Sequence, residues 1–260
     1  ILNRIITWDK EGITYEPDQR HAEIIIRELG IKEESKDIGT PGTKEEVKKE
    51  IGSINNSSEL EAHDATMYRA LVARANYLAQ DRTDIQYSVK ELSRMMSKPG
   101  SHDWGKLKRL ARYLKYKPRL VTKFGYQNYN RYINVWTDTD YAGCIKTRKS
   151  TNGGVALTGS HCIKGWSTTQ AVIALSSGEA EFYGVVKGAS IGIGMRSLYK
   201  DMGVDLEIKM YTDSSAAKGI AYRRGLGKVR HIETNQLWVQ EKIANKDIDL
   251  IKVCGTDNIA

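Results

Sequence analysis

Residues 132–144 read YINVWTDTDYAGC, and this stretch decides the fold of the second half of the chain. Polar and apolar side chains alternate up to Thr137, which predicts a half-buried β-strand that ends at Asp138. The following Asp140-Tyr141-Ala142-Gly143 has the residue types of a turn, so Asp140 is interpreted as a turn residue. A strand followed by a reversal of the chain is therefore predicted.

The residues beyond this stretch continue the pattern of an α/β domain. Two further strands are predicted at 153–158 and 161–166, and a long helix at 177–202. A fourth strand at 206–212, helices at 214–223 and 231–244, and a fifth strand at 248–253 follow. The order βββαβααβ, with three antiparallel strands and then parallel ones, predicts one mixed sheet over residues 131–260.

Two acidic residues stand at the predicted ends of strands. Asp138 follows the first strand of this region, and Asp213 follows the fourth. If these strands are parallel neighbours, both carboxylates emerge at the same edge of the sheet, where ligands bind in open α/β sheets. Two carboxylates in one cleft repel each other unless one is protonated or a cation lies between them. Mg²⁺ is the ion that suits such oxygen ligands.

A third carboxylate is expected from the helix between these strands, where Glu179 and Glu181 compete. Ser176-Ser177-Gly178-Glu179 has the spacing of a capping box, which gives Glu179 a structural role at the start of the helix. Glu181 lies about 200° further round the helix, on the face that must pack against the sheet. An unpaired carboxylate buried there would be costly. Glu181 is therefore assigned to the metal site and Glu179 to capping.

The composition is that of a globular protein long enough for one large or two ordinary domains. Hydrophobic residues make up 40% of the 260 residues and charged residues 28%, which argues against disorder. No stretch has the roughly 20 apolar residues of a membrane span, and no signal-like segment is seen at Ile1. Cys144, Cys162 and Cys254 are few and far apart, which favours a reducing compartment.

The first half of the chain is predicted to be mainly helical after a short β entry. A helix is expected at 18–29 with Asp18 as its N-cap, and a polar linker at 32–60. A long helical pattern at 65–96 is interrupted near 82–84, and a further helix covers 101–116.

The last of these helices begins a strongly basic strip. Residues 101–130 contain eight Lys and Arg residues and one Asp, in a chain of net charge +8. Nucleic acid is the natural partner of such a strip, although a solvated helix face is the alternative for a charge run alone. The residues expected to contact nucleic acid are Lys108, Arg109, Arg112 and Lys115.

Several motifs, taken in order, resemble one known family. WTDTDYAGC (136–144), TRKST (147–151) and ALSSGEAE (174–181) closely resemble the RNase H region of copia-type retrotransposon polyproteins, and YTDS (211–214) and GKVRH (227–231) continue the match. GITYEPDQRH (12–21) and YLAQDR (77–82) look like the segment that follows the polymerase palm in the same polyproteins. The resemblance spans nearly the whole chain.

The resemblance implies three regions and a location inside the cell. Residues 1–59 would be the end of the reverse-transcriptase palm and a linker, 60–130 a basic, helical, thumb- or connection-like region, and 131–260 an RNase H-like domain. The partners would be an RNA–DNA hybrid and the rest of the polyprotein, with no membrane. The expected location is the cytoplasm, within virus-like particles, and the nucleus.

The resemblance also implies an Asp-Glu-Asp-Asp metal site. By motif position, Asp138, Glu181 and Asp213 match the first three acids, which are both the catalytic and the metal-binding residues. The fourth acid of the family follows an Asn-x-Ala, and Asn258-Ile259-Ala260 reaches that point, so a C-terminally truncated domain is expected; Asp257 is not assigned to the site. No Tyr-x-Asp-Asp polymerase motif occurs.

The expected activity is two-metal hydrolysis of RNA in the hybrid. Two Mg²⁺ ions, or Mn²⁺ in their place, would lie on the order of 4 Å apart at the scissile phosphate, and the duplex would be read through backbone shape and 2′-hydroxyls. One alternative is an inactive RNase H-like module that binds nucleic acid or tethers a polymerase. An integrase-type nuclease would need Glu233 or Glu241 instead of Glu181. A translated but idle transposon reading frame is the last alternative. His231 is interpreted as a helix-start residue rather than a catalytic one.

Overall fold

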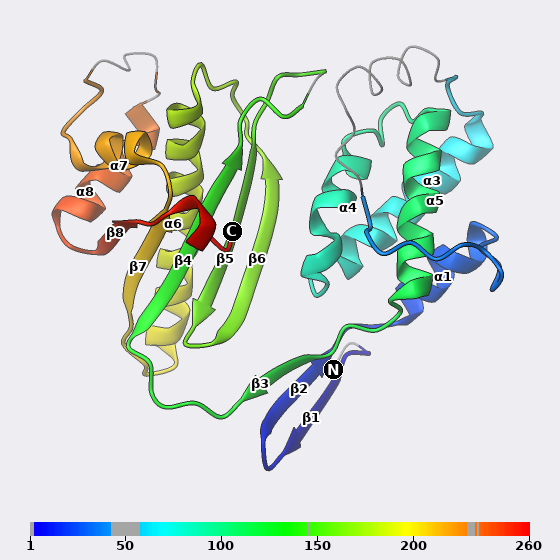
Figure 1. The fold of residues 1–260 in the computed structure, drawn as a ribbon, viewed down its shortest axis with the longest axis horizontal. Coiled ribbons are helices and arrows are strands. Elements are labelled where there is room, and N and C mark those ends of the chain that lie inside the picture. Colours follow the sequence, from blue (N-terminus) through cyan, green and yellow to red (C-terminus); the bar gives the residue numbers. More distant parts are fainter. Residues whose placement is uncertain (1–2, 43–57, 145, 228–231, 233) are drawn as a thin grey trace. The chain divides into compact units, whose positions relative to one another are not determined.

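The structure is a computed structural model, and it describes all residues except 1–2, 43–57, 145, 228–231 and 233. The chain divides into two compact units, Ile1–Tyr126 and Gln127–Ala260, each with its own hydrophobic core (Figure 1). The assignment of 1–59 and 60–130 to palm and thumb regions stays a prediction, as does the boundary at residue 131. The predicted linker falls largely on residues 43–57, outside the described residues.

The first unit is built mainly from helices. They are α1 (Arg20–Glu28), α3 (Ala62–Leu78), the 3₁₀ turn η1 (Thr83–Ile85), α4 (Gln86–Ser93) and α5 (Ser101–Tyr116). The predicted break in the long helical pattern is confirmed at η1. Apolar side chains such as Tyr68, Ile85 and Leu110 are fully buried between these helices, and burial of this kind stabilises the unit.

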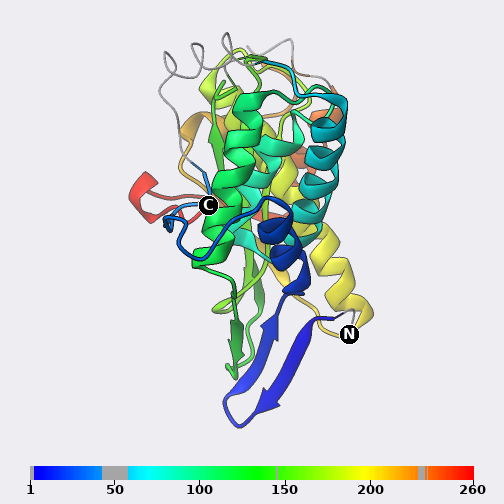
Figure 2. The same cartoon turned by 90° about the vertical axis from the view of Figure 1, so that its right-hand side faces the viewer.

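A small antiparallel sheet completes the first unit. Its strands β1 (Ile5–Asp9), β2 (Gly12–Glu16) and β3 (Thr122–Gly125) pair in the order β1-β2-β3. Figures 1 and 2 both show it below the helices of its own unit. The sequence predicted only a short β entry, because β3 is four residues long and its partner strand lies more than a hundred residues earlier in the chain.

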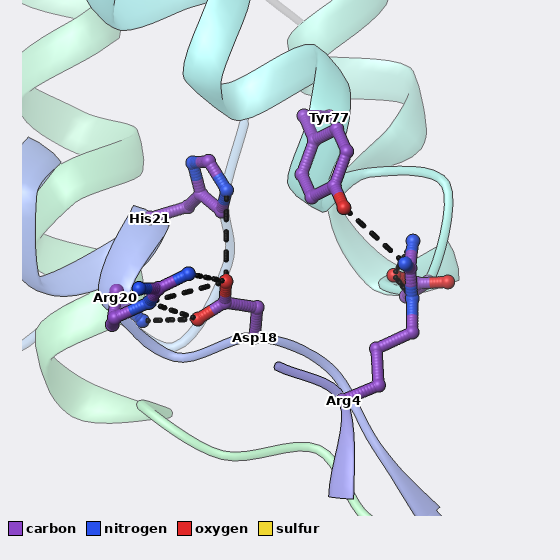
Figure 3. A network of polar contacts seen from close by, with 6 residues as sticks. Arg4, Asp18, Arg20, His21 and Tyr77 are labelled. Atoms are coloured by element: carbon purple, nitrogen blue, oxygen red, sulfur yellow. Dashed lines mark hydrogen bonds and ion pairs between the residues drawn. The ribbon is translucent and has the colours of Figure 1, made fainter. Parts of the chain in front are cut away.

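A partly buried ion pair of Arg4, the residue before β1, connects this sheet to the helices, and a second pair lies at the start of α1 (Figure 3). Arg4 donates to Asp81 through Nε (2.8 Å) and to the Tyr77 hydroxyl through Nη1 (3.2 Å). Asp18 was expected as an N-cap, but α1 begins at Arg20 with Gln19 as its cap. The Asp18 carboxylate instead accepts the Arg20 backbone N–H at 3.1 Å and its guanidinium at 2.8 Å.

The second unit contains a five-stranded mixed sheet. Its elements are β4 (Tyr132–Asp140), β5 (Thr151–Thr158), β6 (His161–Thr169), α6 (Ser177–Asp201), β7 (Glu207–Thr212), α7 (Ser215–Tyr222), η2 (Thr234–Gln236), α8 (Trp238–Ala244), β8 (Ile248–Lys252) and η3 (Gly255–Asp257). The strand order is β6-β5-β4-β7-β8. The pairs β4–β5 and β5–β6 are antiparallel, whereas β4–β7 and β7–β8 are parallel. The predicted fold class, an RNase H-like mixed α/β sheet after a mainly helical region, is confirmed.

Two differences from the expected boundaries have local causes. Strand β4 continues to Asp140 rather than ending at Asp138, because β5 pairs with it as far as Thr151. The helix expected at 231–244 is shorter, since η2 precedes α8, which begins at Trp238. Among the described residues, no helix is both long and apolar enough to cross a membrane.

Helix α6 packs closely on one face of the sheet through a row of glycines. A Cβ on Gly184 would lie 2.7 Å from Thr139 Oγ1, and one on Gly188 would lie 2.5 Å from Thr137 Cγ2. Gly192 is similarly close to side chains of β4 and β7. The glycines at this helical spacing let the helix backbone approach the strands, and the core of the unit is buried between helix and sheet. Figure 1 shows α6 running along the sheet.

This packing gives a matched pair of substitutions on one helix. We expect Gly188→Ala to lower the free energy of unfolding by about 1–3 kcal/mol, because its methyl group would overpack against the stiff Thr137 side chain. Gly194 is exposed, with nothing within 4 Å of its Cβ position, so Gly194→Ala should raise stability by about 0.5–1 kcal/mol. Urea unfolding of both variants measures the difference, and equal effects at the two positions would contradict the packing.

Candidate metal centre

Three carboxylates from separate elements converge at one end of the second unit's sheet. Asp138 lies in β4, Asp213 directly follows β7, and Glu181 is the fifth residue of α6. One oxygen of each can be chosen so that all three lie within 4.8 Å of one another, and all three residues are partly buried. The sequence predicted this set of residues, and the structure brings them together.

Parallel pairing of β4 with β7 sets the distance between the two aspartates. Trp136 is the partner of Tyr211 in the register of these strands, and their rings stack with centroids 4.1 Å apart. Asp138 lies two residues after Trp136, and Asp213 lies two residues after Tyr211. Both side chains therefore emerge at the C-terminal end of parallel neighbours, where binding sites form in open α/β sheets.

The start of α6 fixes the position of Glu181. Ser176 caps the helix by accepting the Glu179 backbone N–H at 3.2 Å. The Glu179 carboxylate accepts the Leu175 N–H at 3.0 Å and the Tyr183 hydroxyl at 2.9 Å. The predicted capping role of Glu179 is confirmed, although it bonds one residue before the N-cap rather than at the N-cap itself. Because the Glu179 carboxylate is used at the start of the helix, Glu181 is the glutamate that is available to the candidate metal centre.

The electrostatics of the cluster favour a cation. Burial, and then the negative charges of Asp138 and Asp213, raise the pKa of Glu181 to about 8. Its Oε2 atom is buried and has no hydrogen-bond partner among the described residues. Unsatisfied carboxylate oxygen beside two further acids is the donor set that a hard divalent cation takes. The cluster is therefore consistent with divalent-metal binding.

The C-terminal segment is anchored beside the cluster. Asn258 Nδ2 donates to the backbone carbonyl of Thr137 at 3.0 Å, next to Asp138. A Cβ on Gly255 would lie 3.3 Å from Asp213 Oδ2. Figures 1 and 2 show this segment, in red, on the opposite side of the sheet from α6. The role of Asn258 as an anchor was missed, because it depends on a contact across more than a hundred residues.

A buried amide pair also supports the site and was missed. Gln170 Nε2 donates to Asn152 Oδ1 at 2.6 Å and to the Ala180 carbonyl at 2.9 Å. The pair joins β5 to the first turn of α6, next to Glu181. Asn152 lies on β5 and Gln170 directly follows β6. Neither residue belongs to a motif, so nothing in the sequence indicates that they are in contact.

The other acidic candidates lie outside the cluster. Over the described part of the chain, Asp138, Glu181 and Asp213 form the one cluster of His, Cys, Asp or Glu side chains that could hold a metal ion. Asp257 is not a member, as expected. Glu241, one of the two glutamates from which an integrase-type nuclease would need its ligand, is exposed on α8. Glu233 and His231 lie outside the described residues.

The four basic residues predicted to contact nucleic acid lie on α5 in the first unit. Lys115 Nζ donates to the Ser35 carbonyl at 2.8 Å and to Asp37 at 2.9 Å, and Arg109 donates to Thr40 Oγ1 at 2.8 Å. These two side chains therefore hold a neighbouring segment of their own unit. Lys108 and Arg112 are partly buried on the same helix. Nucleic-acid binding by these four residues stays a prediction.

The chain is similar in sequence to curated Pol polyproteins of plant transposons. The chain is 29% identical over 202 residues to the retrovirus-related Pol polyprotein from transposon RE2 of Arabidopsis thaliana, which is 76% of this chain and 14% of that protein. It is 27% identical over 184 residues to the Pol polyprotein from transposon TNT 1-94 of Nicotiana tabacum, or 69% of this chain and 14% of that protein. The homologues of this chain are thus retrovirus-related Pol polyproteins of copia-type transposons.

The chain spans only about 14% of the length of these curated relatives. No protein-family model matches it. Among solved structures, it is similar to LC11-RNase H1 isolated from compost, at 16% identity and a TM-score of 0.34, covering 49% of this chain and 88% of that one.

The raised pKa of Glu181 predicts how the stability of this chain responds to pH without metal. Between the ordinary carboxyl value of 4.5 and about 8, the folded protein binds more protons than the unfolded chain, so stability falls as pH rises. Glu181→Gln cannot titrate and should escape this loss. In EDTA we expect the free energy of unfolding of the variant, relative to that of the unaltered chain, to rise by at least about 1 kcal/mol as the pH goes from 5 to 8.5.

Thermal unfolding at several pH values measures this gain. Saturating Mg²⁺ should narrow the gap, because it stabilises only the protein that binds it. Glu241→Gln, which changes an exposed glutamate outside the cluster, is the control and should follow the unaltered chain. A stability gap for Glu181→Gln that does not change with pH would contradict the shared environment of the three acids.

Proposed function

We propose that this chain carries the ribonuclease H activity of a copia-type reverse transcriptase, which hydrolyses the RNA strand of an RNA–DNA hybrid. The observation that supports it most strongly is the convergence of Asp138, Glu181 and Asp213 within 4.8 Å, in a chain related to Pol polyproteins. The proposed partners are the hybrid and the rest of the polyprotein.

The three carboxylates would hold two Mg²⁺ ions, or Mn²⁺. When bound, such ions lower the pKa of an attacking water and stabilise the leaving 3′ oxygen of the RNA. Asp138 and Asp213 are fixed by their strands and supply negative charge from two sides of the site. Glu181 loses its proton when it becomes a ligand, because the ion replaces the repulsion that raises its pKa.

The neighbouring residues position these ligands rather than contact substrate. The Ser176 cap and the Glu179 hydrogen bonds hold the first turn of α6. Asn258 holds the C-terminal segment against β4, so a residue that follows Ala260 in a longer chain would continue from a point close to the site. A fourth acid at that position would complete the set that the family resemblance implies.

Cleavage of a labelled RNA–DNA hybrid tests the proposal. We expect the chain extended beyond Ala260 to cut the RNA strand in Mg²⁺ and to be inactive in EDTA. Asp213→Asn should reduce the rate on the order of a hundredfold or more, because it removes a charge positioned at the reacting phosphate. Asp249→Asn is the matched control, since Asp249 is exposed on β8 and outside the cluster, and its rate should be unchanged.

Two results would contradict the proposal in different ways. Hybrid binding without metal-dependent cleavage by the extended chain would instead identify a non-catalytic module that binds or tethers. Equal cleavage by the Asp213→Asn and Asp249→Asn variants would mean that the three carboxylates are not the reaction centre.

A further inference from the structure

A buried glutamine beside the metal centre keeps one polar atom without a partner. Gln170 directly follows β6 and is 4% exposed. Its Nε2 group donates to Asn152 Oδ1 and to the Ala180 carbonyl, whereas its Oε1 atom is buried and has no hydrogen-bond partner among the described residues. A buried polar atom without a partner lowers stability. The placement of this side chain therefore calls for an explanation.

The orientation of the Gln170 amide follows from the groups around it. The Ala180 carbonyl can only accept a hydrogen bond, so the Gln170 atom that faces it at 2.9 Å is the amide nitrogen. Turning the amide round would set its oxygen against the carbonyl oxygen. The side chain thus leaves Oε1 without a partner while it donates to Ala180.

The Ala180 carbonyl does not need this hydrogen bond for its own satisfaction. Ala180 lies within α6, where a carbonyl accepts the backbone N–H four residues later, here that of Gly184. An apolar side chain of similar size in place of Gln170 would avoid the cost of burying an unpaired acceptor. The additional bond therefore serves to fix the position of the peptide between Ala180 and Glu181.

The same carbonyl is connected to the strand that carries Asp138. Thr139, the residue after Asp138, donates to it through Oγ1 at 3.4 Å, and Asn152 on β5 is the partner of Thr139 in the β4–β5 register. The Gln170 backbone N–H donates to the carbonyl of the fully buried Ser150 at 2.9 Å. Gln170 is thus held at both its backbone and its side chain, and it joins the start of α6 to the sheet.

We infer that Gln170 is a positioning residue for the proposed metal ligand Glu181. The inference rests on the proposed function and adds a residue outside the acidic set. Repulsion from Asp138 and Asp213 pushes the Glu181 carboxylate away from the site when no cation is bound. Because Gln170 holds the carbonyl of the peptide that leads into Glu181, the turn of α6 that carries this ligand cannot yield to the repulsion. The site is therefore ready to take a cation.

Gln170→Met tests this inference on the whole chain, because methionine has a similar length and volume but cannot donate a hydrogen bond. Gln240→Met is the matched control. Gln240 is also buried in this unit, at 9% exposed, and donates to the Ile220 and Gly225 carbonyls at 2.8 and 3.1 Å. It lies on α8, outside the three-acid cluster.

Calorimetric titration with Mn²⁺ measures metal affinity, and thermal unfolding in EDTA measures stability. We expect both variants to lower the melting temperature, because each removes buried hydrogen bonds. Only Gln170→Met should weaken Mn²⁺ binding, roughly tenfold, as for residues that orient a metal ligand. In the chain extended beyond Ala260, the same variant should lower kcat for hybrid cleavage and leave KM for the hybrid unchanged, because Gln170 does not contact substrate.

A second variant separates the hydrogen bond from the fold. Asn152 acts on the metal centre through the Gln170 amide that it holds at 2.6 Å, so Asn152→Leu should weaken Mn²⁺ binding less than Gln170→Met does. The variant with both changes should bind Mn²⁺ no more weakly than Gln170→Met alone, because coupled residues are not additive. If Gln170→Met does not fold, unchanged Mn²⁺ affinity in Asn152→Leu would overturn the inference.

The outcomes distinguish this inference from the proposed function. If the extended chain cleaves the hybrid and Gln170→Met binds Mn²⁺ within about twofold of the unaltered chain, the inference is wrong and the ribonuclease proposal stands. An equal loss of Mn²⁺ affinity in Gln240→Met would also overturn it, because a general loosening of the fold would then explain the effect. A loss confined to Gln170→Met in a chain that never cleaves the hybrid would support the positioning role and overturn the ribonuclease proposal. No Mn²⁺ binding by the unaltered or the extended chain would overturn both.

Discussion

Electrostatic repulsion between three carboxylates is the constraint on which the rest of the second unit depends. Asp138, Glu181 and Asp213 come from three elements that are distant in sequence, yet their oxygens lie within 4.8 Å. Like charges this close are unfavourable without a proton or a cation. The parallel β4–β7 pairing and the close seating of α6 supply the rigidity that holds them together. A site of this kind lowers the stability of the metal-free protein in exchange for affinity for cations.

The same arrangement places α6 and the C-terminal segment on opposite sides of the sheet at the site. The face of α6 that carries Gly184 and Gly188 is in contact with the sheet, so Glu181 reaches the site from the core side. The opposite face of the sheet carries the C-terminal segment, which Asn258 anchors next to Asp138.

Much of this arrangement could be predicted from the sequence, because local patterns determine it. The alternation before Asp138, the capping spacing at Glu179 and the order of strands and helices were sufficient for the fold class and for the choice of Glu181. Contacts between distant segments could not be predicted. Asn258 is anchored on β4, and Lys115 donates a hydrogen bond to the Ser35 carbonyl of its own unit. Both contacts depend on tertiary packing and produce no periodic pattern in the sequence.

Calorimetric titration of metal-free protein with Mg²⁺, repeated in buffers of different ionisation enthalpy at pH 7, tests the central claim most directly. Because Glu181 has a pKa of about 8 before the ion binds, binding should release close to one proton, and the release should disappear well above that pH. Asp138→Asn should abolish the binding. A heat of binding that does not depend on the buffer, or equal binding by the variant, would contradict a cation shared by the three carboxylates.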